Sequence, residues 1–132
     1  MPDNPSEREV HNDALIRSFI DTFEKTDAPL LAPFFTDDIV FENYGDPELR
    51  GSQNLVNMWA GVFRNFPVVR FETVNQAVDG DVVIAEQIHG LALPGKPLAA
   101  IKNLAIYEIR DGKIAAWRDY TNPTKAAELL GP

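Results

Sequence analysis

The sequence predicts an α+β domain in which three helices cover one face of a curved antiparallel sheet. Helices are indicated in the N-terminal half, where apolar side chains recur at helical spacing at Ile16, Phe19, Ile20 and Phe23. Strands are indicated after residue 67, where turn signals at 79–81, 94–97 and 111–112 divide the chain into hairpins. Helices followed by sequential hairpins are typical of this class. A length of 132 residues fits one domain, 1–132, with one core.

The helical half is expected to contain a tail and three helices. Residues 1–8 hold two prolines and several charges, so they are predicted to fray. The first helix is predicted over 9–25. The second is predicted over 30–35, with Pro29 in its first turn and Pro33 limiting its length. The third begins near Gly51-Ser52 and ends at Phe66-Pro67.

The strand pattern begins with a short strand over 39–43, after a loop at 36–38. Four longer strands are predicted over 68–78, 82–93, 98–110 and 113–120, and their short connections imply an antiparallel meander. Residues 124–130 are expected to add one or two helical turns, with Ala126, Leu129 and Leu130 available to cover a cavity.

Composition argues against several classes of partner and cofactor. The net charge of −8 argues against binding to nucleic acid or to an anionic membrane surface. No segment has the length of a membrane span or the apolar core of a signal peptide, so a cytoplasmic location is expected. Two histidines without paired spacing predict no metal site, and the absence of a glycine-rich phosphate loop predicts no nucleotide cofactor. A small neutral or apolar ligand is the expected partner.

A group of polar residues lies on strand faces that otherwise look buried. Its members are Asn43, Gln87, His89, Asn103 and Asp119. A buried polar group needs a hydrogen-bond partner, so five of them are a costly way to build a plain core. A pocket with a polar floor and apolar walls explains them with fewer assumptions.

Asp119 is the predicted proton-transfer group. It shares a strand face with Ala115 and Trp117. A carboxylate that lies beside an indole in a partly desolvated site should have a raised pKa. The Gln87 amide and a His89 N–H are expected to donate to a developing enolate oxygen, and Asn43 to orient the substrate or Asp119. The expected ligand-contacting residues are Trp117, Phe41, Trp59, Phe63, Asn103 and Tyr107, with Leu104 as a further wall candidate of undetermined orientation. Asp119 and a neutral His89 are expected to meet in the pocket.

Three helices followed by a meander that ends in Trp117-Arg118-Asp119-Tyr120 resemble the nuclear-transport-factor-like α+β cone, over residues 10–123. Within that superfamily the chain looks like the group of limonene epoxide hydrolase and the SnoaL-like polyketide cyclases. The resemblance implies helices packed in the concave side of a strongly curved, mixed, mainly antiparallel sheet. It also implies a homodimer formed through the sheets, for which Val82, Ile84, Ile88, Ile106 and Tyr120 are the candidate contacts.

The site residues resemble the cyclases more than the epoxide hydrolases. The hydrolase pattern has Tyr-x-Asn on the first strand, Arg-x-Asp on the second hairpin strand and the Asp of Trp-Arg-Asp-Tyr. This sequence has Phe41, Gln87 and His89 where the tyrosine, the arginine and the first aspartate would be. The cyclase pattern has Asn, Gln, His and Asp at these places, and Asn43, Gln87, His89 and Asp119 match it. This resemblance implies an intramolecular aldol closure with Asp119 as general acid and base, and with no metal or cofactor.

The sequence therefore predicts an acid/base enzyme for an apolar or polycyclic carbonyl-containing ligand, of the cyclase type. A limonene-epoxide-hydrolase-like hydrolase or a ketosteroid-isomerase-like isomerase on the same scaffold is the first alternative. A domain that binds a small molecule without chemistry is the second.

Overall fold

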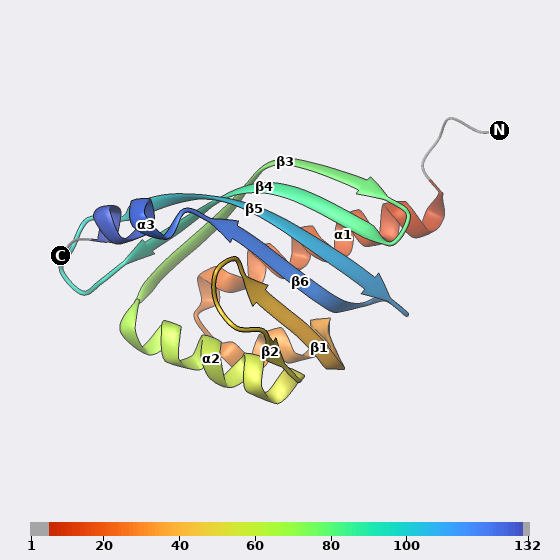
Figure 1. The fold of residues 1–132 in the computed structure, drawn as a ribbon, viewed down its shortest axis with the longest axis horizontal. Helices are drawn as coiled ribbons and strands as arrows, with labels where there is room; N and C mark the ends of the chain where they lie inside the picture. The colour runs from red at the N-terminus through yellow and green to blue at the C-terminus, as the bar shows by residue number, and fades with distance from the viewer. Residues whose placement is uncertain (1–5, 131–132) are drawn as a thin grey trace.

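The computed structural model describes residues 6–130, which form one six-stranded sheet and several helices (Figure 1). The helical elements are α1 (Glu7–Thr22), η1 (Phe23–Lys25), η2 (Ala28–Phe34), α2 (Ser52–Asn65) and α3 (Pro123–Leu130). The strands are β1 (Phe35–Asn43), β2 (Leu49–Arg50), β3 (Val68–Asp79), β4 (Val82–Ala92), β5 (Ala99–Arg110) and β6 (Lys113–Thr121). The predicted α+β class is confirmed.

The sheet has the strand order β2-β1-β6-β5-β4-β3. The hairpin strands β3 to β6 pair antiparallel, as their short turns predict, whereas β1 pairs parallel with β6. The sheet is therefore mixed and mainly antiparallel, and Figure 1 shows how strongly it curves around the helices. The parallel pair sets Asn43 opposite Asp119, at the end of β1.

The N-terminal half differs in detail from the prediction. Ser6 caps α1 by accepting from the Glu9 backbone N–H, while the Glu9 side chain accepts from the Ser6 backbone N–H, so the helix begins at Glu7 and not at residue 9. Only residues 1–5 of the predicted tail lie outside the described residues. The second helix is a 3₁₀ helix, η2, which accommodates Pro33. The loop expected at 36–38 belongs to β1, because an irregularity after Phe35 allows the strand to continue.

A similar irregularity corrects the face assignment in β6. The pairing with β5 shifts between Ile114 and Ala116, so Ala115 is the extra residue. Ile114 is consequently buried, and the inner face of β6 consists of Ile114, Trp117 and Asp119 where Ala115, Trp117 and Asp119 were expected.

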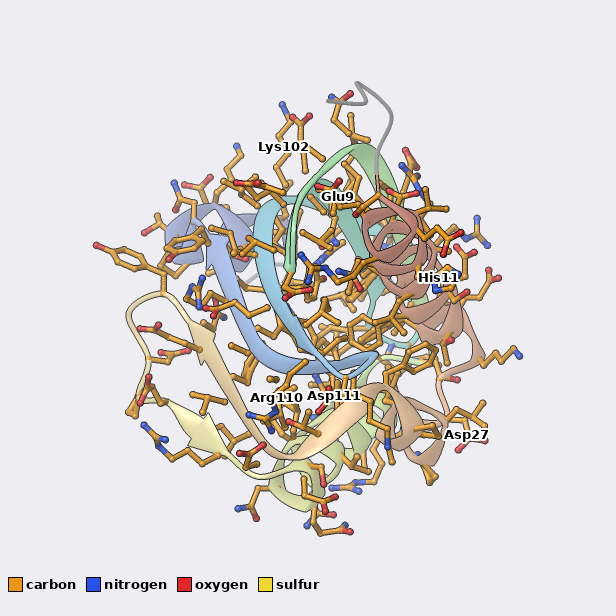
Figure 2. The ribbon with its side chains drawn as sticks, turned by 90° about the vertical axis from the view of Figure 1, so that its right-hand side faces the viewer. Glu9, His11, Asp27, Lys102, Arg110 and Asp111 are labelled. Atoms are coloured by element: carbon orange, nitrogen blue, oxygen red, sulfur yellow. The ribbon has the colours of Figure 1, made fainter. Side chains whose placement is uncertain are left out.

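Charged side chains cover the outer surface, among them Glu9, Lys102 and Arg110 (Figure 2). His11, also labelled there, lies exposed on α1, as expected. None of the helices within residues 6–130 is both long and apolar enough to cross a membrane.

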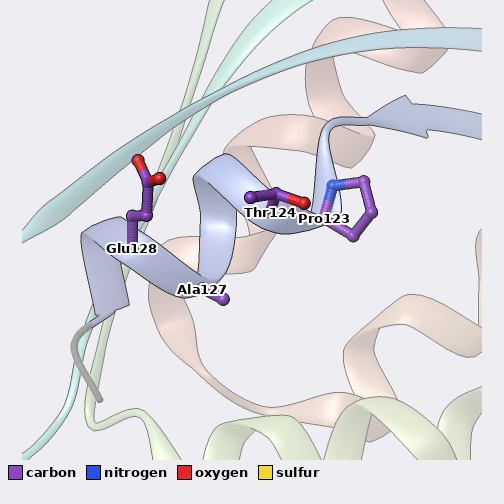
Figure 3. A pocket seen from close by; sticks show the side chains of 4 residues that line it. All are labelled: Pro123, Thr124, Ala127 and Glu128. Atoms are coloured by element: carbon purple, nitrogen blue, oxygen red, sulfur yellow. The ribbon is translucent and has the colours of Figure 1, made fainter.

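Helix α3 follows β6 directly and carries a shallow depression on its outer side. Pro123, Thr124, Ala127 and Glu128 line it (Figure 3). All four residues are exposed, and Glu128 pairs with Lys125 at 3.5 Å. The depression lacks the buried, convergent polar groups of a specific ligand site.

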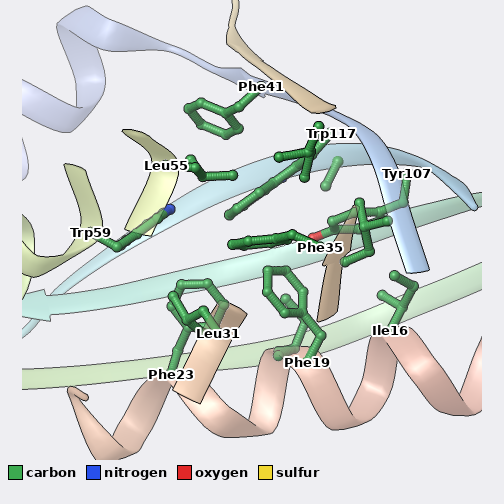
Figure 4. Close-up of a cluster of buried hydrophobic side chains, with 14 of the residues drawn as sticks. Ile16, Phe19, Phe23, Leu31, Phe35, Phe41, Leu55, Trp59, Tyr107 and Trp117 are labelled. Atoms are coloured by element: carbon green, nitrogen blue, oxygen red, sulfur yellow. The ribbon is translucent and has the colours of Figure 1, made fainter. Parts of the chain in front are cut away.

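The core between the helices and the sheet is rich in aromatic rings (Figure 4). Phe19 of α1 and Phe23 of η1 make edge contacts with the Trp117 ring, at centroid distances of 5.2 and 6.1 Å. Trp59 of α2 stacks parallel to Trp117 at 5.8 Å. Trp117 is completely buried, so it forms the rigid base on which the next inward-facing residue of β6, Asp119, is placed.

Candidate active site

A cavity of about 430 Å³ lies between α2, α3 and the concave face of the sheet. Its lining residues are Phe41, Asn43, Asp46, Pro47, Leu49, Met58, Trp59, Val62, Phe66, Phe71, His89, Leu91, Ile101, Asp119, Thr121, Ala126 and Leu130. Asp46 and Pro47 are exposed and mark the rim, whereas His89 and Asp119 are buried. The cavity thus has apolar walls and a small polar floor, which is the usual composition of a small-molecule site.

Asp119 lies on this floor with its two carboxylate oxygens in different surroundings. Oδ1 accepts from the Trp117 Nε1–H at 2.7 Å and from the Asn103 amide at 3.1 Å. Within residues 6–130, no hydrogen bond engages Oδ2. Burial raises the pKa of Asp119 to about 6, and the hydrogen bonds from Asn103 and Trp117 offset part of that rise. Because Oδ1 is occupied by two donors, a proton that binds Asp119 goes to Oδ2.

Asn103 connects Asp119 with the rest of the polar floor. It lies on β5, between β6 and β4, and its Nδ2 is 3.1 Å from Asp119 Oδ1, 3.4 Å from Gln87 Oε1 and 3.3 Å from His89 Nε2. Its Oδ1 accepts from the Thr121 hydroxyl at 2.7 Å. No hydrogen bond joins His89 to Asp119 directly among the described residues, so the expected direct pair is corrected: the strand order inserts Asn103 between them.

The network also defines the state of His89. The Gln87 Nε2 donates to the Tyr107 hydroxyl at 3.1 Å, which turns Gln87 Oε1 toward the His89 Nε2, 2.8 Å away. Assigned from this network, Nε2 carries the proton and donates, and Nδ1 carries the lone pair. Burial lowers the pKa of His89 to about 3, so the ring is neutral at pH 7, as expected from the sequence.

This arrangement changes two predicted roles. The Gln87 amide is engaged within the network on both sides, and the His89 N–H is directed to Gln87. Neither is therefore free to donate to an enolate oxygen, as the sequence suggested. The ring of His89 also stacks on Phe71 at a centroid distance of 3.9 Å, which fixes its plane.

The predicted ligand-contacting residues divide into two groups. Phe41 and Trp59 line the cavity. Trp117, Phe63, Asn103 and Tyr107 are buried but do not contribute to the cavity wall. The structure thus corrects their expected role to one of support behind the wall. Leu104 is 43% exposed on the opposite face of the sheet and cannot be a wall residue.

Several lining residues were not predicted from the sequence. Phe71 and Ile101 alternate with solvent-facing residues, and Leu91 is half-buried between the buried Gly90 and Ala92. A sheet that faces an ordinary core shows the same patterns, so nothing distinguished cavity from core. Thr121 was missed because the predicted strand ended at residue 120. Of the three residues proposed to cover the cavity, Ala126 and Leu130 line it, and Leu129 is exposed.

Two polar atoms near the cavity are buried and have no hydrogen-bond partner in the part of the chain that the structure describes. They are the Oδ1 of Asn43 and the indole Nε1 of Trp59. An unpaired buried polar group is costly, and in a native protein it points to a missing partner such as a ligand or water. Both residues line the cavity, so a ligand that both donates and accepts hydrogen bonds suits them.

Metal coordination has no support within residues 6–130, where no group of three or more His, Cys, Asp or Glu side chains converges. Among the described residues, His89 and Asp119 are the buried titratable groups on the cavity wall, and the other polar lining groups are the Asn43 amide, the Trp59 indole, the Thr121 hydroxyl and the exposed Asp46 carboxyl at the rim. This donor set suits proton transfer and hydrogen bonding better than it suits a metal ion.

The family to which this fold and site belong is identified by comparison. The model of the SnoaL-like domain matches residues 16–117, well over half of the chain. The chain belongs to the SnoaL-like domain family. The match covers Asn43, Gln87, His89 and Asn103, and it ends two residues before Asp119, so the position of that carboxylate is known from the structure alone.

Relatives of this SnoaL-like protein include proteins with different named activities. The epoxide hydrolase EphG of Mycobacterium tuberculosis is 26% identical over 107 residues, which cover 80% of this chain and 69% of that protein. The solved structure of a limonene-epoxide-hydrolase-like epoxide hydrolase from M. tuberculosis superposes with a TM-score of 0.79 at 22% identity, covering 92% of this chain and 90% of the other. A protein assigned to the SnoaL-like polyketide cyclases from Jannaschia sp. CCS1 superposes with a TM-score of 0.84 at 16% identity, covering 99% and 100%.

Proposed function

We propose that this SnoaL-like protein is a cofactor-independent acid/base enzyme that closes a ring in an apolar, carbonyl-containing substrate by an intramolecular aldol reaction. The observation that carries the proposal is the carboxyl group of Asp119. It lies on the floor of an apolar cavity, its pKa is raised to about 6, and its Oδ2 has no partner in the described residues. A base with a pKa near the working pH is suited to proton transfer.

The proposed reaction uses Asp119 Oδ2, the carboxylate oxygen that no hydrogen bond engages within residues 6–130. Asp119 Oδ2 takes a proton from the carbon beside one carbonyl group, which leaves an enolate. The enolate carbon attacks a second carbonyl carbon of the same substrate, and a carbon–carbon bond forms as that C=O becomes an alkoxide. Asp119 then returns its proton to the alkoxide oxygen. The product is an isomer of the substrate, so no oxidant, reductant or leaving group is required.

The enolate oxygen needs hydrogen-bond donors in the cavity. The two candidates are the NH₂ group of Asn43, which lies across from Asp119 on β1, and the Trp59 indole N–H, which has no hydrogen-bond partner among residues 6–130. His89 Nδ1 supplies an acceptor for a substrate hydroxyl or enol. These roles replace the donors that the sequence suggested on Gln87 and His89.

Charge and size restrict the substrate. Within residues 6–130, the cavity is lined by the carboxyl groups of Asp46 and Asp119 and by no lysine or arginine. Anionic substrates are therefore disfavoured, in line with the net charge of −8. The volume of 430 Å³ accommodates about 14 water-sized groups. One or two fused rings fit inside it, and a longer polycyclic substrate extends past the rim at Asp46 and Pro47.

The first test uses hydrogen exchange on a bicyclic ketone. In D₂O the wild-type protein should catalyse exchange of the protons beside the carbonyl of 2-tetralone, followed by NMR. Asp119→Asn should lose this catalysis by about 10²–10⁴-fold, because the amide cannot accept the proton. Asp46→Asn is the matched control, since Asp46 is an exposed rim carboxyl, and it should retain exchange. Equal rates in wild type and Asp119→Asn would contradict the proposal.

Epoxide hydrolysis is the second candidate function, favoured by the similarity to EphG. It requires an acid and a base around a positioned water. Here Gln87 and a neutral His89 occupy the positions that the hydrolase resemblance assigns to arginine and aspartate. Asp119 alone remains as a carboxyl group on the floor. Diol formation from limonene oxide by wild type, without exchange of 2-tetralone, would favour this function over cyclisation.

Two further measurements distinguish the remaining alternatives. Exchange accompanied by movement of a double bond in a β,γ-unsaturated ketone, without ring closure of a diketone, would indicate an isomerase. Saturable quenching of tryptophan fluorescence by 2-tetralone, with no exchange in any variant, would indicate a binding domain.

A further inference from the structure

We propose that Asn103 is a positioning residue for Asp119, and that Thr121 holds the Asn103 amide in the orientation this requires. This inference rests on the proposed function in one respect, that Asp119 transfers the proton. It assigns roles to two residues that do not themselves need to touch the substrate's reacting atoms.

The geometry orients the Asn103 amide from both sides. Its oxygen accepts from the Thr121 hydroxyl at 2.7 Å, and this directs the NH₂ group toward Asp119 and Gln87. One N–H donates to Asp119 Oδ1 at 3.1 Å, and the other points to Gln87 Oε1 at 3.4 Å. Asn103 is only 4% exposed. A reversed amide would bury its oxygen against two acceptor oxygens, so the observed orientation is strongly preferred.

As a consequence, Oδ1 of the Asp119 carboxylate is engaged in hydrogen bonds, while Oδ2 can take up and release a proton. Asn103 and the Trp117 indole together occupy Oδ1. The proton therefore exchanges at Oδ2, and the carboxyl plane cannot rotate without losing two hydrogen bonds to a charged group. Asn103 also joins β6 to β4, because Gln87 Oε1 accepts from both Asn103 and His89. The same amide thus links the orientation of the base to that of the His89 ring.

The titratable groups around Asp119 are few. His89 faces it from β4, Tyr107 from β5 and Asp46 from the loop between β1 and β2. His89 is neutral at pH 7, and burial together with the Asp119 charge raises the pKa of Tyr107, so both are uncharged there. The α2 and β3 residues of the wall, such as Met58, Trp59 and Phe71, carry no charge. Hydrogen bonding by Asn103 and Trp117 therefore dominates the stabilisation of the ionised form.

The experiment measures the pKa of Asp119 in the ligand-free protein by ¹³C NMR of its carboxyl carbon, assigned by the absence of that signal in Asp119→Asn. Asn103→Leu, which removes a donor to the ionised form, should raise this pKa by about one to two pH units. Thr121→Val should produce a smaller rise, and Thr121→Ser, which restores the hydroxyl, should return the value to that of wild type. The acidic limb of the exchange rate of 2-tetralone should move to higher pH by the same amounts.

The matched control is Thr36→Val. The Thr36 hydroxyl bonds the Ile114 backbone oxygen at 3.4 Å and lies away from the cavity lining, so the same substitution there should leave the pKa of Asp119 unchanged. An unchanged pKa in a folded Asn103→Leu protein would overturn the inference. If that variant does not fold, the Thr121→Val and Thr121→Ser pair decides, and equal values in the two would overturn it. Because the titration needs no substrate, a protein that shows the shifts but no turnover would refute the proposed function alone.

Discussion

Asp119 and His89 lie on the same cavity floor with pKa shifts of opposite sign and the same physical cause. Burial disfavours the charged form of each, so the carboxyl pKa rises to about 6 and the imidazole pKa falls to about 3. For Asp119 the folded-state pKa is raised, so its contribution to stability is complete below its ordinary value of 3.8 and is lost as the pH rises through about 6. For His89 the contribution is complete above 6.5 and is lost as the pH falls toward about 3.

The variant Asp119→Asn should therefore gain stability relative to wild type as the pH rises from 4 to 7. The amide retains an oxygen that accepts from Asn103 and Trp117, and it carries no charge to desolvate. The relative gain in the free energy of unfolding between pH 4 and pH 7 should be on the order of 1–3 kcal/mol. Urea unfolding followed by tryptophan fluorescence at both pH values measures it. A difference between the two proteins that does not change with pH would contradict the buried, raised carboxyl.

The composition of the polar floor was predictable from the sequence, but its connections were not. Asn43, Gln87, His89, Asn103 and Asp119 each stood out as polar residues on apolar strand faces. Which of them touch depends on the lateral order of the strands, which alternation along one strand does not specify. The sequence therefore pointed to these five polar residues, but it gave His89 as the donor to Asp119. In the structure Asn103 and Trp117 donate to Asp119 Oδ1.

At the scale of elements, the position of His89 depends on the close packing of β4 against β3 at Gly90. Gly90 follows His89 and pairs with Arg70 across the strands. A methyl group placed on Gly90 would lie 2.8 Å from the Arg70 carbonyl oxygen and 3.3 Å from the Leu98 side chain. The first contact is to backbone, which cannot move aside without disturbing the pairing that positions His89.

We expect Gly90→Ala to lower the free energy of unfolding by about 1–3 kcal/mol, as overpacking does in other cores. Gly61→Ala is the matched control. Gly61 lies in α2, where an added methyl meets only the end of the Arg64 side chain at 3.5 Å, and alanine is the better helix former by about 0.5–1 kcal/mol. The two substitutions should therefore have opposite signs in urea unfolding. A Gly90→Ala protein as stable as Gly61→Ala would show that β3 and β4 can separate at no cost.

Hairpin strands were predictable to within a few residues because their turns carry glycine, proline and aspartate. The irregularities in β1 and β6 were not, since an extra strand residue such as Ala115 has no signature of its own. β2 was missed for a related reason, because two residues are too few to show alternation. These irregularities decide which face several side chains occupy, and they explain the misplaced Ala115.

At the scale of the whole molecule, the helices cover only the concave face of the sheet (Figure 1). The opposite face presents apolar residues to solvent. Ile84, Leu104 and Tyr120 are each about 40% exposed there, and register pairs Leu104 with Tyr120 and Ile84 with the half-buried Ile106. We refer to these four residues as the convex patch. The mixed character of the sheet was implied by the family resemblance and not by local pattern. The parallel pairing of β1 with β6 was not predicted, because the two strands are far apart in the sequence.

We expect two copies of the protein to associate through the convex patch and form a homodimer. A contiguous exposed apolar surface favours a partner, and twofold pairing of identical surfaces is the commonest solution among soluble proteins. Sedimentation of the wild-type protein at micromolar concentration should give twice the chain mass of 14.7 kDa.

Leu104→Glu should give a monomer, because the partner's patch would bury its carboxylate without compensation. Val10→Glu is the control, since Val10 is also exposed but lies on α1, which packs on the concave face, away from the convex patch. It should leave the dimer intact. A dimer that survives Leu104→Glu would place the interface elsewhere. Exchange of 2-tetralone should persist in the monomer, because every residue of the polar floor comes from one chain.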